Sequence, residues 1–186
     1  MKGFLALAGF QFACEGLIPL LIMLVRHENF SHYGFTQRRV LRSLGLAIAL
    51  AVICDLGMSW HAGTLLWIPF RRHSATRMAL AAGFPANVLG LSIAVAVWGF
   101  FEAFFGVFFA KKLNEAIGHN GRGWLSPGTL GFAFFNGLIH FALGQGVSGF
   151  VSSFASGYAI AVIPAVTGNA WGSALVQTLT NAVGRM

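Results

Sequence analysis

The chain has 186 residues, of which 56% are hydrophobic and only 9% are charged, and its mean hydropathy is +0.73. Soluble domains carry about 25% charged residues, so this composition excludes an ordinary soluble globular domain. The net charge of +7 comes from short basic clusters between apolar runs. Such clusters are typical of membrane proteins, where they set the topology and contact anionic lipid headgroups. We therefore expect no nucleic-acid partner.

The apolar runs predict an all-α fold, a polytopic integral membrane helix bundle of about six transmembrane helices. The length predicts a single domain, residues 1–186. Nineteen Phe and 24 Gly fit such a bundle, because glycine lets helix backbones approach closely. The predicted runs cover residues 3–25, 43–58, 84–110, 129–147, 148–166 and 169–184.

The first run, residues 3–25, is long enough to span a membrane. Gln11 and Glu15 are four residues apart and share a helix face, and Pro19 could kink the second half. Glu15 is either a polar residue that faces the bundle or a residue at the membrane interface.

The second run, residues 43–58, is followed by another apolar stretch at 64–70. The two form either one long tilted helix or a helix broken near Gly57 and Gly63. Asp55 and His61 are six residues apart and do not share a helix face, so a metal pair is not expected there.

Two basic loops, residues 26–42 and 111–128, are predicted to lie on the same side of the membrane. The positive-inside rule then favours both termini outside the cytoplasm. The cationic residues of the two loops are Arg26, Arg38, Arg39, Arg42, Lys111, Lys112 and Arg122.

The fifth run carries a ridge of small residues at every fourth position. Such a ridge lets another helix approach closely. It is either a packing seam inside the bundle or the contact face for a helix–helix partner. The ridge consists of Gly149, Ser153, Gly157, Ala161 and Ala165.

The third run places a single carboxylate, Glu102, among aromatic, aliphatic and glycine residues. A carboxylate at bilayer depth costs several kcal/mol unless it is neutral, paired or wetted. The candidate partners are His140, Gln177 and Asn181, which lie in later apolar runs. Trp98 precedes Glu102 by four residues and shares its face.

These polar groups predict an intramembrane cavity formed by Glu102, His140, Gln177 and Asn181. A carboxylate near an imidazole can perform general acid–base chemistry, and an amide can donate to an oxyanion. The same groups would also serve as an inert buried hydrogen-bond network. Asn136 shares a face with His140, and Asn136, Gln177 and Trp98 are candidate substrate-binding residues. One glutamate and one histidine are too few for a zinc site, so we expect no metal and no cofactor.

At these residues the chain resembles the CAAX-protease and bacteriocin-processing family, also called the ABI family, of intramembrane glutamate proteases. The likeness covers most of the chain, although each motif is short. The segment 101–113 is similar to the family's EExxxR helix, and 136–140 to its FxxxH motif. The segments 168–172 and 177–181 together are similar to its HxxxN motif, and 33–39 to its first cytoplasmic loop.

The resemblance implies that Glu102 activates water, that His140 assists and that Asn181 holds the oxyanion. The chain also departs from the family pattern. Only one glutamate is present, Asn136 replaces an aromatic residue, and Gln177, which cannot act as a general base, replaces the second histidine.

Three classes of function follow from these observations. The first is an intramembrane, metal-independent endopeptidase acting on a membrane-anchored peptide. The second is a catalytically inactive homologue that binds a membrane protein or lipid as an assembly or immunity factor. The third is a small transporter or an accessory subunit of a membrane complex. In each case we expect the bilayer as the surroundings, and the cell membrane of a prokaryote as the location.

Overall fold

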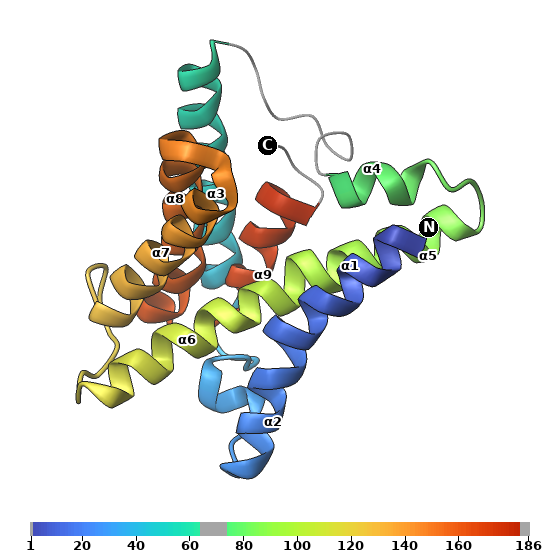
Figure 1. The fold of residues 1–186 in the computed structure, drawn as a ribbon. Helices are drawn as coiled ribbons and strands as arrows, with labels where there is room; N and C mark the ends of the chain where they lie inside the picture. The colour runs from blue at the N-terminus through green and yellow to red at the C-terminus, as the bar shows by residue number, and fades with distance from the viewer. Residues whose placement is uncertain (1, 64–73, 183–186) are drawn as a thin grey trace.

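The computed structural model of the protein describes residues 2–63 and 74–182, and this part of the chain is all-helical (Figure 1). The prediction of an all-α fold is confirmed. Four of the elements are π-helical turns (η1, η3, η4 and η5), and η2 is a 3₁₀ helix. In chain order the elements are α1 (Lys2–Phe12), η1 (Ala13–Leu17), α2 (Ile18–Val25), η2 (Phe30–Tyr33), α3 (Val40–Ala62), α4 (Ser74–Leu80), α5 (Ala86–Ala94), η3 (Val95–Phe101), α6 (Glu102–Ala116), α7 (Pro127–His140), η4 (Phe141–Gln145), α8 (Gly146–Thr167), α9 (Trp171–Gln177) and η5 (Thr178–Ala182).

Within the described residues, four helical stretches are long and apolar enough to cross a membrane. These are Lys2–Val25, Val40–Gly57, Ala86–Ala116 and Pro127–Thr167. The last stretch contains two helices, because the backbone leaves the helical conformation at Gly144, with φ of 82°. The helices α7 and α8 therefore fold back on each other (Figure 1). At the C-terminal end, α9 and η5 together are shorter than the roughly 20 residues that a spanning helix needs.

Pro19 is the second residue after the π-helical turn η1. Proline has no N–H to donate to the carbonyl four residues earlier, so it interrupts α-helical hydrogen bonding. The backbone N–H of Ile18 donates instead to the carbonyl oxygen of Ala13, the i→i−5 pattern of a π turn. The helix thus continues past Pro19 to Val25 with altered hydrogen bonding.

The second apolar run forms one helix, α3, which is continuous through Gly57 and ends at Ala62. Gly63 caps it with a φ of 65°, a left-handed conformation that glycine adopts without strain. The apolar stretch 64–70 lies outside the described residues, as does the side chain of His61.

The small-residue ridge of α8 faces α7. A Cβ atom on Gly157 would meet Ala133 and Asn136 of α7. The Asn136 side chain donates to the carbonyl oxygen of Ser153 at 2.8 Å, which ties the two helices together at the ridge. Ser153 and Ala161 are buried, so α7 of the same chain occupies this face.

Asn169, in the turn between α8 and α9, is completely buried and joins three segments of the chain. Its side-chain amide donates to the carbonyl oxygens of Thr36 and Arg38, each at 2.8 Å. Its own carbonyl oxygen accepts from the Ser43 hydroxyl at 2.8 Å. These bonds hold the first loop and the start of α3 against the α8–α9 turn.

The helices α3 and α9 touch at Gly172. A Cβ atom there would collide with the backbone carbonyl oxygen of Ser43, so only glycine fits without movement of the helices. The amide N–H of Gly172 also donates to Ser43 Oγ at 2.8 Å.

We expect Gly172→Ala to lower the free energy of unfolding by about 1–3 kcal/mol, because overpacking forces the two helices apart. Gly45→Ala is the matched control, since a Cβ atom on Gly45 in α3 has open space around it. That change should be neutral or stabilise by up to about 1 kcal/mol. Denaturant unfolding of both variants in detergent micelles measures the difference, and equal effects would contradict the packing at Gly172.

Candidate functional site

Glu102, the first residue of α6, meets the C-terminal helical segment. The side-chain amide of Asn181, in η5, donates to Glu102 Oε2 at 2.8 Å. Gln177, at the end of α9, also contributes a side-chain hydrogen bond to the Glu102 carboxyl group. The structure thus brings together three of the predicted site residues.

A second carboxyl group, Glu15 of η1, joins this cluster. It lies close enough for its charge to act on Glu102, and Gln11 provides it with a side-chain hydrogen bond. Sequence reasoning placed Gln11 and Glu15 on one face of the first helix, but it did not place Glu15 near Glu102. The signal was a second carboxylate inside an apolar run, next to an amide on the same face.

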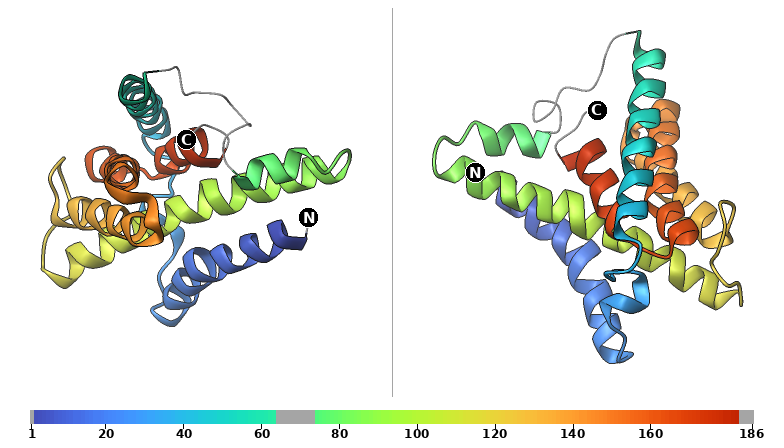
Figure 2. Two further views of the ribbon diagram at one scale, coloured as in Figure 1. Left: turned by 45° about the horizontal axis from the view of Figure 1, so that its top comes forward. Right: turned by 180° about the vertical axis from the view of Figure 1, so that it is seen from behind.

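Two glycines allow the helices to approach Glu102 from both sides. A Cβ atom on Gly99 of η3 would collide with the hydroxyl oxygen of Thr178 in η5. A Cβ atom on Gly16 of η1 would lie 3.0 Å from the ring of Phe101. Both views of Figure 2 show α1 alongside the helix that contains η3 and α6, in agreement with these contacts.

The polar residues of the cluster lie in or beside π-helical turns. Glu15 is in η1, Glu102 directly follows η3, and Asn181 is in η5. The backbone N–H of Glu102 donates to the carbonyl oxygen of Val97, five residues earlier. A π turn rotates the residues after it relative to a regular helix, and such turns occur frequently at functional sites. Face assignments based on a period of 3.6 residues are therefore displaced across such turns, although Gln177 and Asn181 still meet the same carboxyl group.

His140 is placed differently from the other candidate residues. It ends α7 next to the turn at Gly144, and its Nδ1 lies 3.1 Å from Gln145 Oε1. In the part of the chain that is described, Gln145 is its hydrogen-bond partner, and the contacts of Glu102 come from Asn181, Gln177 and Glu15.

Asn136 and Trp98, the other two candidates, contact residues of α8 and α1. The Asn136 amide is bound to the Ser153 carbonyl oxygen. Trp98 is 5% exposed and packs against Phe4 of α1, with ring centroids 5.8 Å apart. Trp98 therefore helps hold the N-terminal helix, which carries Glu15, against η3.

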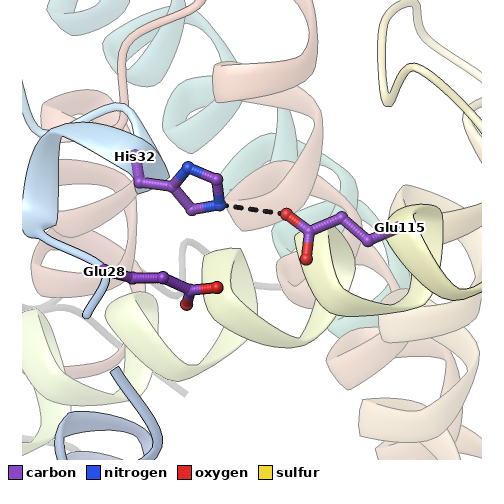
Figure 3. A group of neighbouring side chains, drawn as sticks. All are labelled: Glu28, His32 and Glu115. Carbon is purple, nitrogen blue, oxygen red and sulfur yellow. Dashed lines mark hydrogen bonds and ion pairs between the residues drawn. The ribbon is translucent and has the colours of Figure 1, made fainter. Parts of the chain in front are cut away.

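A charged cluster connects the two basic loops at the end of the molecule where α6 terminates. Lys112 Nζ lies 2.6 Å from Glu28 Oε1 and 2.8 Å from Glu115 Oε2. His32 Nε2 lies 3.0 Å from Glu115 Oε1 (Figure 3). The Tyr33 hydroxyl donates to Glu28 Oε2. These contacts show that the segments 26–42 and 111–128 meet at one end of the molecule, and their location on one side of the membrane stays a prediction.

The ligand atoms of Glu28, His32 and Glu115 lie within 4.8 Å of one another, which is close enough to hold a metal ion. Lys112, however, already bridges the two carboxylates and supplies the positive charge that a metal would bring. Two of the three groups are also exposed. This arrangement favours an ion-pair network that fastens α6 to the first loop.

No protein-family model, curated protein or solved structure matches this chain.

The Glu102–Asn181 hydrogen bond predicts energetic coupling between the two residues. We expect a double-mutant cycle of Glu102→Met and Asn181→Leu to give about 0.5–2 kcal/mol, because either single change strands a buried partner. Unfolding in detergent micelles measures each corner of the cycle. The control cycle, Glu102→Met with Asn136→Leu, should be additive within about 0.5 kcal/mol, since the two residues share no hydrogen-bond partner. Equal coupling in both cycles would contradict the pairing.

The charged cluster predicts a loss of stability in acid. Burial raises the pKa of Glu28, but hydrogen bonds from Lys112, Tyr33 and Arg26 outweigh it and lower the pKa from the ordinary value of 4.5 to about 2. Ionised Glu28 therefore stabilises the fold above pH 4.5, and this contribution is lost as the pH falls towards 2. The unfolding temperature of wild type should fall more steeply over this range than that of Glu28→Gln. Parallel pH profiles would exclude Glu28 as the cause.

Proposed function

We propose that this chain is an integral membrane protein that binds, within the bilayer, a polar group of a membrane-anchored peptide or membrane protein. The four apolar stretches support a membrane location. We further propose about six membrane-embedded segments, because each of the six apolar runs overlaps a helical segment and α7–α8 forms a hairpin. Within the described residues, the sixth segment, α9–η5, is too short to cross the bilayer on its own. The proposed location is the cell membrane of a prokaryote.

One observation supports the binding proposal most directly. Two buried acceptor atoms of the Glu102 cluster, Glu15 Oε2 and Gln177 Oε1, have no hydrogen-bond partner among the described residues. An unsatisfied buried acceptor costs about 1–3 kcal/mol, so a fold retains it at a cost to its stability. A ligand with N–H or O–H donors would recover this free energy on binding. A peptide backbone carries such donors at every residue other than proline.

In this interpretation the chain is a divergent, catalytically inactive relative of the CAAX-protease and bacteriocin-processing family. Gln177 cannot accept a proton as a histidine would, and its oxygen is free to accept a hydrogen bond instead. The hydrogen-bond partner of His140 among the described residues is Gln145 and not Glu102. An assembly or immunity factor needs a binding site but not the acid–base pair.

A second candidate function is peptide hydrolysis, and the Glu102–Asn181 contact favours it. The two residues are 79 positions apart in the chain and come from different apolar helices. Glu102 would take a proton from the attacking water and pass it to the leaving amine. Asn181 has a second N–H that could donate to the oxyanion.

The experiment that tests both candidates uses purified protein in bicelles and a panel of synthetic membrane-anchored peptides. Fluorescence titration measures binding, and mass spectrometry detects cleavage. We expect Gln177→Leu to weaken binding roughly tenfold, because it removes an acceptor that the ligand satisfies. Ser92→Ala is the control, since its hydroxyl is bound to the Val88 carbonyl oxygen within α5.

The outcomes separate the two functions. Binding without cleavage, weakened by Gln177→Leu and unaffected by Ser92→Ala, supports the binding protein. Cleavage that disappears in Glu102→Gln supports the peptidase instead. Equal binding by wild type and Gln177→Leu would overturn the proposed role of the unpaired acceptors.

A further inference from the structure

We infer that a cavity at the charged end of the protein binds a phosphate group at the membrane surface. This inference is independent of the Glu102 cluster, which lies elsewhere on the protein. The cavity has a volume of about 540 Å³ and lies between η2, the end of α6, the loop after α6 and the end of α8. Its volume falls within the range of small-molecule binding sites.

The charge of the lining favours an anion. Arg39, Lys111 and Arg122 are the cationic residues that line the cavity, and Glu115 is the acidic one among the described lining residues. The Glu115 carboxylate is already paired, with Lys112 at 2.8 Å, His32 at 3.0 Å and Lys111 at 3.6 Å. Arg39 and Arg122 therefore remain as lining cations that no carboxylate among the described residues neutralises.

Hydrogen-bond donors are available at the same place. Asn114 lines the cavity and is 6% exposed, and its Oδ1 accepts from the Gly128 N–H at 2.8 Å. Its Nδ2 group has no hydrogen-bond partner in the described chain, so this buried amide keeps its two donors for a ligand. Nor does the guanidinium of Arg122 have a hydrogen bond or ion pair to any described residue. His119 Nδ1 accepts from the Gly121 N–H at 2.9 Å, which places the hydrogen of a neutral ring on Nε2.

Phosphate is the anion that this set of donors fits best. Its oxygens accept several charged and neutral hydrogen bonds at once, and guanidinium groups bind it in a bidentate manner. A carboxylate would use fewer of the donors. An inorganic cation is excluded by the charge of the lining.

The position of the cavity fits the headgroup layer of a membrane. The apolar stretches Ala86–Ala116 and Pro127–Thr167 both terminate here. Trp124 and Leu125, in the adjoining loop, are 50% and 73% exposed. Tryptophan is enriched at membrane interfaces, where phospholipids present their phosphates. The phosphate could thus belong to a lipid or to a phosphorylated solute, and both share the same recognition chemistry.

The test titrates purified protein in neutral detergent with phosphatidylglycerol in one arm and with glycerol phosphate in the other. Native mass spectrometry counts the bound molecules and gives the dissociation constants. We expect Arg122→Gln to weaken binding roughly tenfold, because it removes a charged hydrogen-bond donor that binds nothing else in the described chain.

Arg38→Gln is the matched control. Arg38 is an exposed arginine outside the cavity lining, and its replacement changes the net charge by the same amount. We expect it to leave binding unchanged. Thermal unfolding of each variant verifies that both remain folded, and Lys111→Gln provides a second lining variant.

Each outcome is decisive. Binding of phosphatidylglycerol alone supports the inference with a lipid headgroup as the source, and binding of both ligands supports it with a soluble phosphate compound. Equal losses in Arg122→Gln and Arg38→Gln would overturn it in favour of general charge attraction. Absence of binding in both arms would also overturn it.

Discussion

A carboxyl group on an apolar helix must be met by donors from its neighbours, since hydrocarbon offers none. Glu102 imposes this requirement on the structure. Asn181 and Gln177 provide hydrogen-bond donors to it from the C-terminal segment α9–η5, whose described residues are too few to span a membrane alone. The contact between Gly99 and Thr178 brings the two segments close enough for these bonds. The chemistry of this one side chain thus helps to position the last helix, together with its contacts to α3 at Gly172.

The same helix, α6, is fixed at both ends by charged or polar contacts. Asn181 holds its first residue, and Lys112 holds its last turns to Glu28 of the first loop. Between these ends, Phe104 is fully buried and its ring lies 6.0 Å from that of Tyr33. This aromatic layer separates the Glu102 cluster from the charged end. The two polar regions are therefore chemically distinct, one rich in acceptors and the other in donors.

The sequence was sufficient to predict the helices and the need of Glu102 for a partner, because apolar runs and isolated charges are local signals. It also predicted that Gln177 and Asn181, four residues apart, would share a partner. It did not predict that Glu15 would join them or that His140 would contact Gln145. Spacing fixes the face of one helix but not its rotation against another, and the π turns and the turn at Gly144 alter that rotation.

The small-residue ridge also shows that sequence spacing identifies a helix face but not the partner of that face. Sequence spacing identified Gly149, Ser153, Gly157 and Ala161 as a surface for close helix contact, but an internal and an external partner require the same spacing. The turn at Gly144 decides between them, because it folds α7 onto the ridge. With this face filled, the unsatisfied polar groups of the described chain lie at the Glu102 cluster and in the cavity at the charged end. Ligand recognition is therefore expected at polar sites, whereas helix packing accounts for the small residues.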